Sequence, residues 1–193
     1  MDTTFIDELA SAAPTPGGGG ASAYVGALAA AAASMVGNLT VGKKTYADVE
    51  DEVKASLACL SSLRERLLHL VDEDARAFEP LSATYRMPKN TPDELAARNE
   101  AMQAALVEAS DVPLAIMRTI ATVMDEVEFL AHHGSKLARS DAGVAAAFAR
   151  AASDGASLNI YINAASMDDA ARSAYYREEA DSLAARTRER CDE

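Results

Sequence analysis

Apolar residues recur along most of this chain at spacings of three and four, which is the period of an amphipathic helix. Strand-like runs that alternate Val, Ile and Thr are absent, whereas the helix formers Ala, Leu, Glu, Arg and Met dominate. The pattern predicts an all-α fold, an up-and-down bundle of long helices. Because 193 residues suit one domain with a sizeable core, we expect residues 1–193 to form a single domain.

Glycine and proline divide the pattern into six helical segments. Gly42 marks the end of the second helix, Pro80 interrupts the backbone ladder of the third, and Pro113 bends the fourth. The predicted helices run over about residues 3–12, 20–40, 47–79, 92–132, 140–165 and 168–190.

Two helix starts carry capping residues. Thr91 precedes Pro92 and is followed three residues later by Glu94, which is the pattern of a capping box. Ser140 is the predicted N-cap of the fifth helix, with Asp141 in its first turn, where a negative charge complements the helix dipole.

The segment 14–42 contains no charged residue and is long enough to cross a bilayer. Most of it is Ala, Gly, Ser and Thr, so it is a poor lipid-facing helix. We interpret it as the central helix of a bundle, apolar on all sides because other helices surround it. No membrane partner is therefore expected.

Composition excludes other functions. With 18 Lys and Arg against 30 Asp and Glu, the net charge of −12 repels nucleic acid and anionic membranes. Cys59 and Cys191 form no redox or metal-binding pair, and the acidic N-terminal residues do not suit a signal peptide, so we expect a cytoplasmic protein. The three histidines lack zinc-site spacing, so no metal is expected.

One carboxylate breaks the apolar face of the third helix. At 100° per residue, Asp74 falls between Val71 and Phe78 on the inward stripe, whereas Asp72 points away from it. A buried carboxylate needs a cation or hydrogen bonds, or it titrates with a raised pKa. Asp74 is therefore either a structural residue or a catalytic acid or base.

Three other polar features have both a structural and a functional interpretation. Asn159 and Asn163 share one helical face, and either tie helices together or present amides to a ligand. Lys43 and Lys44 follow a helix end, where they either complement its dipole or bind a carboxylate. The glycines 17–20 in PTPGGGGAS form either a linker or a close approach of backbone to a ligand.

Five segments in this order and spacing resemble the cyclodeaminase/cyclohydrolase family, and the resemblance covers nearly the whole chain. The family comprises the C-terminal domain of formiminotransferase-cyclodeaminase and stand-alone methenyltetrahydrofolate cyclohydrolases. The segments are PTPGGGGAS, SMVGNLTVGKKTYADVE, LVDEDARAF, MPKNTPDE and RSDAGVAAAFARAASDGASLNIYIN. The resemblance implies a helical bundle that forms a homodimer, with folate bound at or near the subunit interface.

The resemblance also implies the chemistry. A cyclodeaminase closes 5-formiminotetrahydrofolate to 5,10-methenyltetrahydrofolate with loss of ammonia, and a cyclohydrolase opens the methenyl ring to 10-formyltetrahydrofolate. Either reaction needs a proton shuttle, for which Asp74 is the first candidate and Asp72 a weaker one. Tetrahydrofolate is the substrate, and no tightly bound cofactor is expected. The implied substrate-binding residues are Gly17, Gly18, Gly19, Gly20, Lys43, Lys44, Ser140, Asp141, Asn159 and Asn163.

Alternatives remain open from the sequence. An inactive folate-binding or scaffolding dimer would keep the same motifs, and a phosphate- or nucleotide-binding protein rests on the glycines alone. Gly134 and Ser135 stand where relatives often carry Gly-Asn, which puts a polar contact there in doubt. No formiminotransferase segment is expected in this chain, so either a separate enzyme delivers a formimino substrate or the protein is a cyclohydrolase and needs none.

Overall fold

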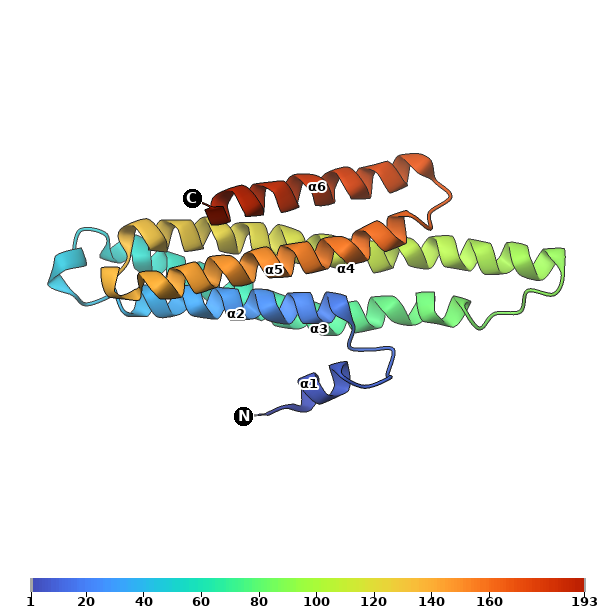
Figure 1. Cartoon of the computed structure of the whole chain (residues 1–193), viewed down its shortest axis with the longest axis horizontal. Coiled ribbons are helices and arrows are strands. Elements are labelled where there is room, and N and C mark those ends of the chain that lie inside the picture. The colour runs from blue at the N-terminus through green and yellow to red at the C-terminus, as the bar shows by residue number, and fades with distance from the viewer. Residues whose placement is uncertain (1, 193) are drawn as a thin grey trace.

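The chain forms an all-α structure, seen in a computed structural model that describes residues 2–192 (Figure 1). No strand occurs in that range, which confirms the predicted fold class. The helices are α1 (Thr4–Leu9), α2 (Gly18–Asn38), α3 (Glu50–Thr84), α4 (Pro92–His133), α5 (Arg139–Ala164) and α6 (Ala170–Asp192), with short 3-10 helices η1 (Lys44–Tyr46) and η2 (Lys136–Ala138).

Helices α2 to α5 run up and down and form the bundle, and α6 lies along α4 and α5 (Figure 1). The core is built from Ala, Leu, Ile, Val and Met side chains, with α2 packed against α3, α4 and α5. By length and composition α2 is apolar enough to cross a membrane, but 61% of its apolar window is buried by the other helices. This burial agrees with its interpretation as the central helix.

Helix α3 does not end at Pro80, so the predicted boundary at residue 79 is wrong. The helix continues to Thr84, because Leu81 is buried against α4 in a second apolar cluster and Thr84 is buried as well. Pro80 deprives the Arg76 carbonyl of its helical donor, but Arg76 and Pro80 are both exposed, so water reaches that carbonyl. One more turn of α3 therefore projects beyond the proline.

The helix starts follow the predictions in one case of three. The Thr91 hydroxyl accepts from the Glu94 amide and Glu94 accepts from the Thr91 amide, so the capping box is confirmed. Ser140 is not an N-cap, because η2 runs directly into α5 and Ala138 takes that position. Helix α2 begins at Gly18 rather than Gly20, so three of the four glycines lie inside its first turn.

Candidate functional site

A pocket of about 300 Å³ lies where α2 begins and α5 ends, against the second half of α3 and the first half of α4. This volume is at the lower end of the range for small-molecule sites. Its polar lining comes from Asp74, Asn159, Asn163 and Ser166, together with backbone around Thr15 and the glycines 17–19. Its apolar lining is Pro14, Phe78, Leu81, Tyr85, Met102, Leu106, Ala109 and Ile162.

Asp74 enters this pocket from the inward face of α3, as the helical period predicted. Its Oδ2 accepts a hydrogen bond of 2.8 Å from the Gly20 amide, and Oδ1 accepts none from residues 2–192. Burial raises the pKa of the Asp74 carboxyl above its usual range, and the Gly20 hydrogen bond offsets part of that increase. Asp74 therefore combines a desolvated carboxyl with access to a cavity, as a general acid or base requires.

The glycines make room for that carboxyl. A Cβ on Gly19 would lie only 2.6 Å from Cγ of Asp74, whereas one on Gly18 would meet Asn159 at an ordinary 3.7 Å and one on Gly17 would meet nothing within 4 Å. Close packing of α2 on Asp74 thus requires glycine at position 19. The amide of Gly20, at the positive end of α2, is already taken by Asp74 and is not free for a substrate anion.

The two asparagines differ in what they contact. Nδ2 of Asn163 donates to the Ala109 carbonyl of α4 at 2.9 Å, and that carbonyl lacks its helical partner because Pro113 has no N–H. Among residues 2–192, the side chain of Asn159 bonds only to the Gly155 carbonyl of its own helix, at 3.1 Å. Asn163 therefore joins two helices as well as lining the pocket, and Asn159 keeps its carbonyl oxygen available to a ligand.

The sequence analysis missed the far wall of the pocket. Asp74, Phe78, Leu81 and Tyr85 follow one another at i, i+4, i+7 and i+11, so they share the face of α3 that lines the cavity. Tyr85 was missed because the helix was predicted to end before Pro80. The same spacing, continued past the proline, was the available signal.

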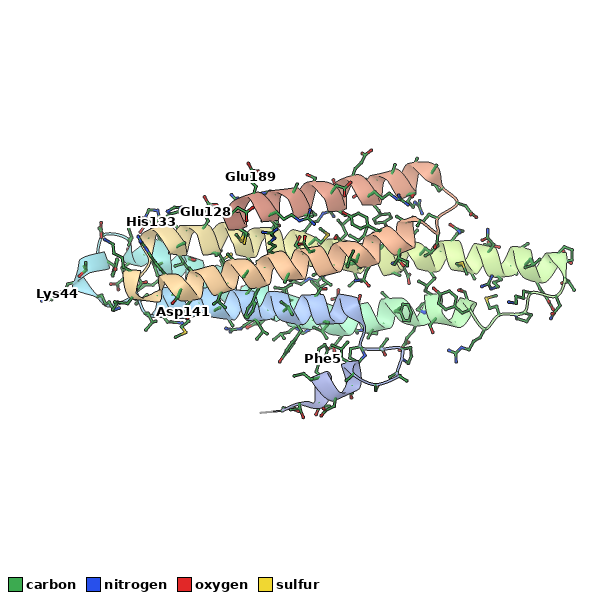
Figure 2. The ribbon with its side chains drawn as sticks, in the orientation of Figure 1. Phe5, Lys44, Glu128, His133, Asp141 and Glu189 are labelled. Carbon is green, nitrogen blue, oxygen red and sulfur yellow. The ribbon has the colours of Figure 1, made fainter. Side chains whose placement is uncertain are left out.

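Other predicted site residues lie elsewhere in this chain. Lys43, Lys44, Ser140 and Asp141 are at the opposite end of the bundle, where Figure 2 labels Lys44 and Asp141. At ~1.5 Å per residue, Asp141 and Asn159 are about 27 Å apart along α5. None of the four lines the pocket.

Asp72 also lies outside the pocket. It is exposed on the neighbouring surface of α3, in a shallow depression beside Phe5 and Pro16. Of the two predicted catalytic carboxylates, the structure brings only Asp74 together with the glycines and the asparagines.

The fold and this site define a helical-bundle protein with a desolvated carboxyl in a small-molecule pocket. The chain belongs to the formiminotransferase-cyclodeaminase family, whose sequence profile matches residues 2–182. Methenyltetrahydrofolate cyclohydrolase of Methylorubrum extorquens is 48% identical over 168 residues, which are 87% of this chain and 81% of that protein.

Longer relatives match as well. Formimidoyltransferase-cyclodeaminase of Sus scrofa is 35% identical over 93% of this chain, and that of Mus musculus is 36% identical over 88%. This chain spans only 33% and 32% of those two proteins. A crystal structure of formiminotetrahydrofolate cyclodeaminase from Thermotoga maritima superimposes with a TM-score of 0.88 at 32% identity, over 100% of this chain and 92% of the other.

Proposed function

We propose that this protein is a folate one-carbon enzyme, and specifically a methenyltetrahydrofolate cyclohydrolase. The relative of that name is 48% identical over 168 residues, whereas the cyclodeaminase relatives are between 28% and 36% identical. The reaction adds water to the 5,10-methenyl bridge of tetrahydrofolate and opens the ring to the 10-formyl compound.

The charge of the pocket is the observation that supports a folate one-carbon reaction at this site, and the 48% identical relative is what favours ring opening over deamination. Its lining contains one carboxylate, Asp74, and no Lys or Arg. The methenyl bridge is an amidinium, so the reacting carbon belongs to a cation, and a desolvated carboxylate beside it is attractive in a medium of low dielectric constant. In this proposal the same carboxylate takes a proton from the attacking water.

The mechanism uses Asp74 twice. Water attacks the methenyl carbon, a C–O bond forms, and Asp74 accepts a proton from that water, which leaves a neutral carbinol. The N5–C bond then breaks as Asp74 returns its proton to N5, and the hydroxyl proton leaves to solvent as the formyl C=O forms. One proton is released per turnover. A raised pKa suits this exchange, because it brings the carboxyl closer to the operating pH.

A cyclodeaminase is the second candidate, favoured by the Thermotoga maritima structure of that name. N10 of 5-formiminotetrahydrofolate would attack the formimino carbon, and Asp74 would carry a proton to the departing ammonia. That substrate is also an amidine, so the pocket charge suits it too. A formiminotransferase would have to supply that substrate, and this chain spans about a third of the length of the relatives named formimidoyltransferase-cyclodeaminase.

We also propose that the protein is a cytoplasmic homodimer formed across α2 and α5. Both helices expose large apolar side chains, and the described α2 carries no charge. Two copies with a net charge of −12 repel one another least across a neutral face. The exposed apolar residues are Tyr24, Leu28 and Met35 on α2, Leu39 directly after it, and Val144, Phe148, Leu158 and Ile162 on α5.

The experiment follows the methenyl chromophore and ammonia in parallel with each folate substrate. Loss of the chromophore from 5,10-methenyltetrahydrofolate, faster than without enzyme, supports the cyclohydrolase. Ammonia release from 5-formiminotetrahydrofolate supports the cyclodeaminase instead. Folate binding without turnover of either substrate would identify a binding or scaffolding protein. A protein that shows no folate binding and no turnover would overturn the proposal. Sedimentation of wild type and of a Leu28→Glu, Phe148→Glu variant tests the dimer face.

A further inference from the structure

The pocket lies between two helices that are diagonal in the bundle. Helices α3 and α5 both pack on α2 and α4, and they run in the same direction (Figure 1). On the α5 side, Asn159, Asn163 and Ser166 follow one another at i, i+4 and i+7 and all line the cavity. On the α3 side, the lining is Asp74 followed by apolar side chains. The pocket therefore has a polar edge along α5, formed by these three residues, and a largely apolar wall along α3.

Ser166 forms the end of the polar edge that is farthest from Asp74. Asp74 and Asn159 both approach glycines in the first turn of α2, so these two side chains are level in the bundle. Ser166 follows Asn159 by seven residues, a rise of about 10 Å. Among residues 2–192 its Oγ donates only to the Ile162 carbonyl, at a long 3.3 Å. Because a hydroxyl oxygen can also accept, Ser166 keeps hydrogen-bonding capacity for a ligand.

The turn that carries Ser166 is held by the side-chain amide of Gln103 on α4. Nε2 of Gln103 donates to the Ser166 carbonyl at 3.1 Å, and Oε1 accepts from the Asp168 amide at 2.9 Å. One amide thus binds two backbone groups of the turn that follows α5. Gln103 does not line the pocket, whereas its neighbour Met102 does. The Gln103 amide therefore acts on the pocket through the turn.

Two side-chain bonds tie the polar edge to α4. One is the bond from Asn163 to the Ala109 carbonyl inside the bundle, and the other is the bond from Gln103 to the Ser166 carbonyl. The amide and the hydroxyl of Ser166 bond within their own segment, to the carbonyls of Asn163 and Ile162. Without Gln103, no hydrogen bond among the described residues would fix Ser166 against α4.

A flat heterocycle with a hydrogen-bonding edge suits these two sides of the pocket. The amides and the hydroxyl of the polar edge can pair with ring nitrogens, carbonyls and amino groups, while Phe78 and Leu81 offer apolar surface to a ring face. A pterin that carries its one-carbon bridge at Asp74 can extend along the polar edge. Ser166 then lies beside the part of the ring system that is distant from the reacting carbon.

We propose that Gln103 is a positioning residue of this enzyme, which holds the Ser166 hydroxyl where it binds the heterocycle of the substrate. This inference rests on the proposed function, in which the heterocycle is the pterin of tetrahydrofolate. Gln103 bonds to neither Asp74 nor the residues beside it, and Ser166 is remote from the reacting carbon. Loss of either side chain should therefore weaken substrate binding without slowing the proton transfer.

The test measures kcat and KM for 5,10-methenyltetrahydrofolate, together with calorimetric binding of 5-formyltetrahydrofolate, which has no methenyl bridge to open. Ser166→Ala removes only the hydroxyl and should raise KM about 3- to 10-fold, as for one neutral hydrogen bond, with kcat unchanged. Gln103→Met keeps the length of the side chain without its amide and should raise KM by a similar factor. The calorimetric Kd should rise in parallel in both variants.

The double variant distinguishes positioning from a purely structural role. If Gln103 acts through the Ser166 hydroxyl, Gln103→Met should add little to KM once that hydroxyl is gone. The effects on urea unfolding should instead add, because Gln103 bonds the Ser166 carbonyl, which Ser166→Ala retains. Effects on KM that add fully would overturn the inference. A Gln103→Met variant that loses stability with unchanged KM and Kd would also overturn it.

Asn99→Ala is the matched control. Asn99 lies one turn before Gln103 on α4, and its Nδ2 donates to the Asp168 carboxylate at 2.7 Å. The variant removes a bond from α4 to the same turn but leaves the Ser166 carbonyl bound to Gln103, so KM should stay at the wild-type value. An equal rise in KM for Asn99→Ala would show that any loosening of the turn suffices and would refute the specific role of Gln103.

The binding measurement also distinguishes the two levels of the argument. A wild-type protein that binds no folate would overturn the proposed function and this inference with it. A wild-type protein that binds 5-formyltetrahydrofolate with the same Kd as Ser166→Ala and Gln103→Met would overturn only the inference.

Discussion

The two ends of the bundle both place polar groups between helices, but only the end that holds Asp74 places an ionisable group with a raised pKa beside a cavity lined by the glycines and asparagines. At the end that carries η1 and η2, the Thr40 hydroxyl donates to the Val36 carbonyl at 2.7 Å and accepts from the Ser135 amide at 2.8 Å. Lys43 Nζ donates to the Ser135 hydroxyl at 3.1 Å, and the Tyr46 hydroxyl accepts from the Lys136 amide at 3.0 Å. These bonds close the end of the bundle.

At the other end, Asp74 has one hydrogen bond, a raised pKa and a cavity beside it. A buried polar group with all its partners stabilises a fold, whereas one held with too few is retained for chemistry or binding. The difference identifies the Asp74 end as the candidate site and the Ser135 end as a structural closure. Ser135 belongs to that closure, since its amide and its hydroxyl both take part in these bonds.

The largest effect is expected for Asp74→Asn. The amide can still accept from Gly20 but cannot shuttle a proton, so kcat/KM for ring opening should fall by about 10²- to 10⁴-fold. Circular dichroism should show an unchanged helical fold. Asp72→Asn is the comparison, and a loss of similar size there would refute the assignment to Asp74.

Replacing Gly19 with Ala should give the next largest loss. The new methyl overlaps the Asp74 carboxyl, which has to move, and a displacement of about 1 Å can reduce a rate by about 10²-fold. The matched substitution is Gly17→Ala, which is two residues earlier and has open space around it. Steady-state kinetics that show equal losses at the two positions would mean that helix entry, and not contact with Asp74, requires glycine.

The pH dependence should separate wild type from Asp74→Asn. Because burial raises the folded-state pKa of Asp74, kcat/KM should fall as the pH decreases through a value above the ordinary ~3.9 for aspartate. The ionised carboxyl that supports activity lowers the stability of the folded state, because its charge is desolvated. The Asp74→Asn variant should therefore unfold at a higher temperature than wild type at neutral pH. That advantage should decrease as the pH falls below the folded pKa and be gone below the unfolded pKa of ~3.9. An advantage that persists below pH 3 would have another cause.

At the closed end, Thr40→Val should reduce stability with little effect on the reaction. The variant leaves the buried Ser135 amide without an acceptor, at a cost of about 1–3 kcal/mol. Urea unfolding measures this loss, while kcat/KM per folded molecule should stay near wild type. A fall in kcat/KM that matches the Asp74 variant would show that the two ends are coupled.

Helical period predicted the residues whose environment is set within one helix. It placed Asp74 inward and Asp72 outward, and the Thr91 capping box is confirmed. It could not place Lys43 relative to Asn159, because that depends on which ends of the helices meet. It also missed Tyr85, because local propensity ends a helix at proline and the burial of Leu81 against α4 overrides that propensity.

The smallest expected effect is at Asn163, whose side chain contacts both α4 and the pocket. Its substitution can show whether this amide joins two helices, binds substrate, or does both. Asn163→Ala should cost about 0.5–1.5 kcal/mol, because the Ala109 carbonyl loses its donor. Pro113→Ala supplies a new N–H to that carbonyl, so in this background Asn163→Ala should cost less. Urea unfolding of the four proteins measures the coupling free energy.

The same cycle, measured by KM for the folate substrate, reports the other role of Asn163. A contact with the pterin would raise KM by the same factor in both backgrounds, because Pro113→Ala repairs the Ala109 carbonyl but not a missing ligand contact. A KM effect that disappears together with the stability effect would show that Asn163 acts only by joining α5 to α4. Asn159, which makes no bond to another helix within residues 2–192, would then be the asparagine that contacts substrate.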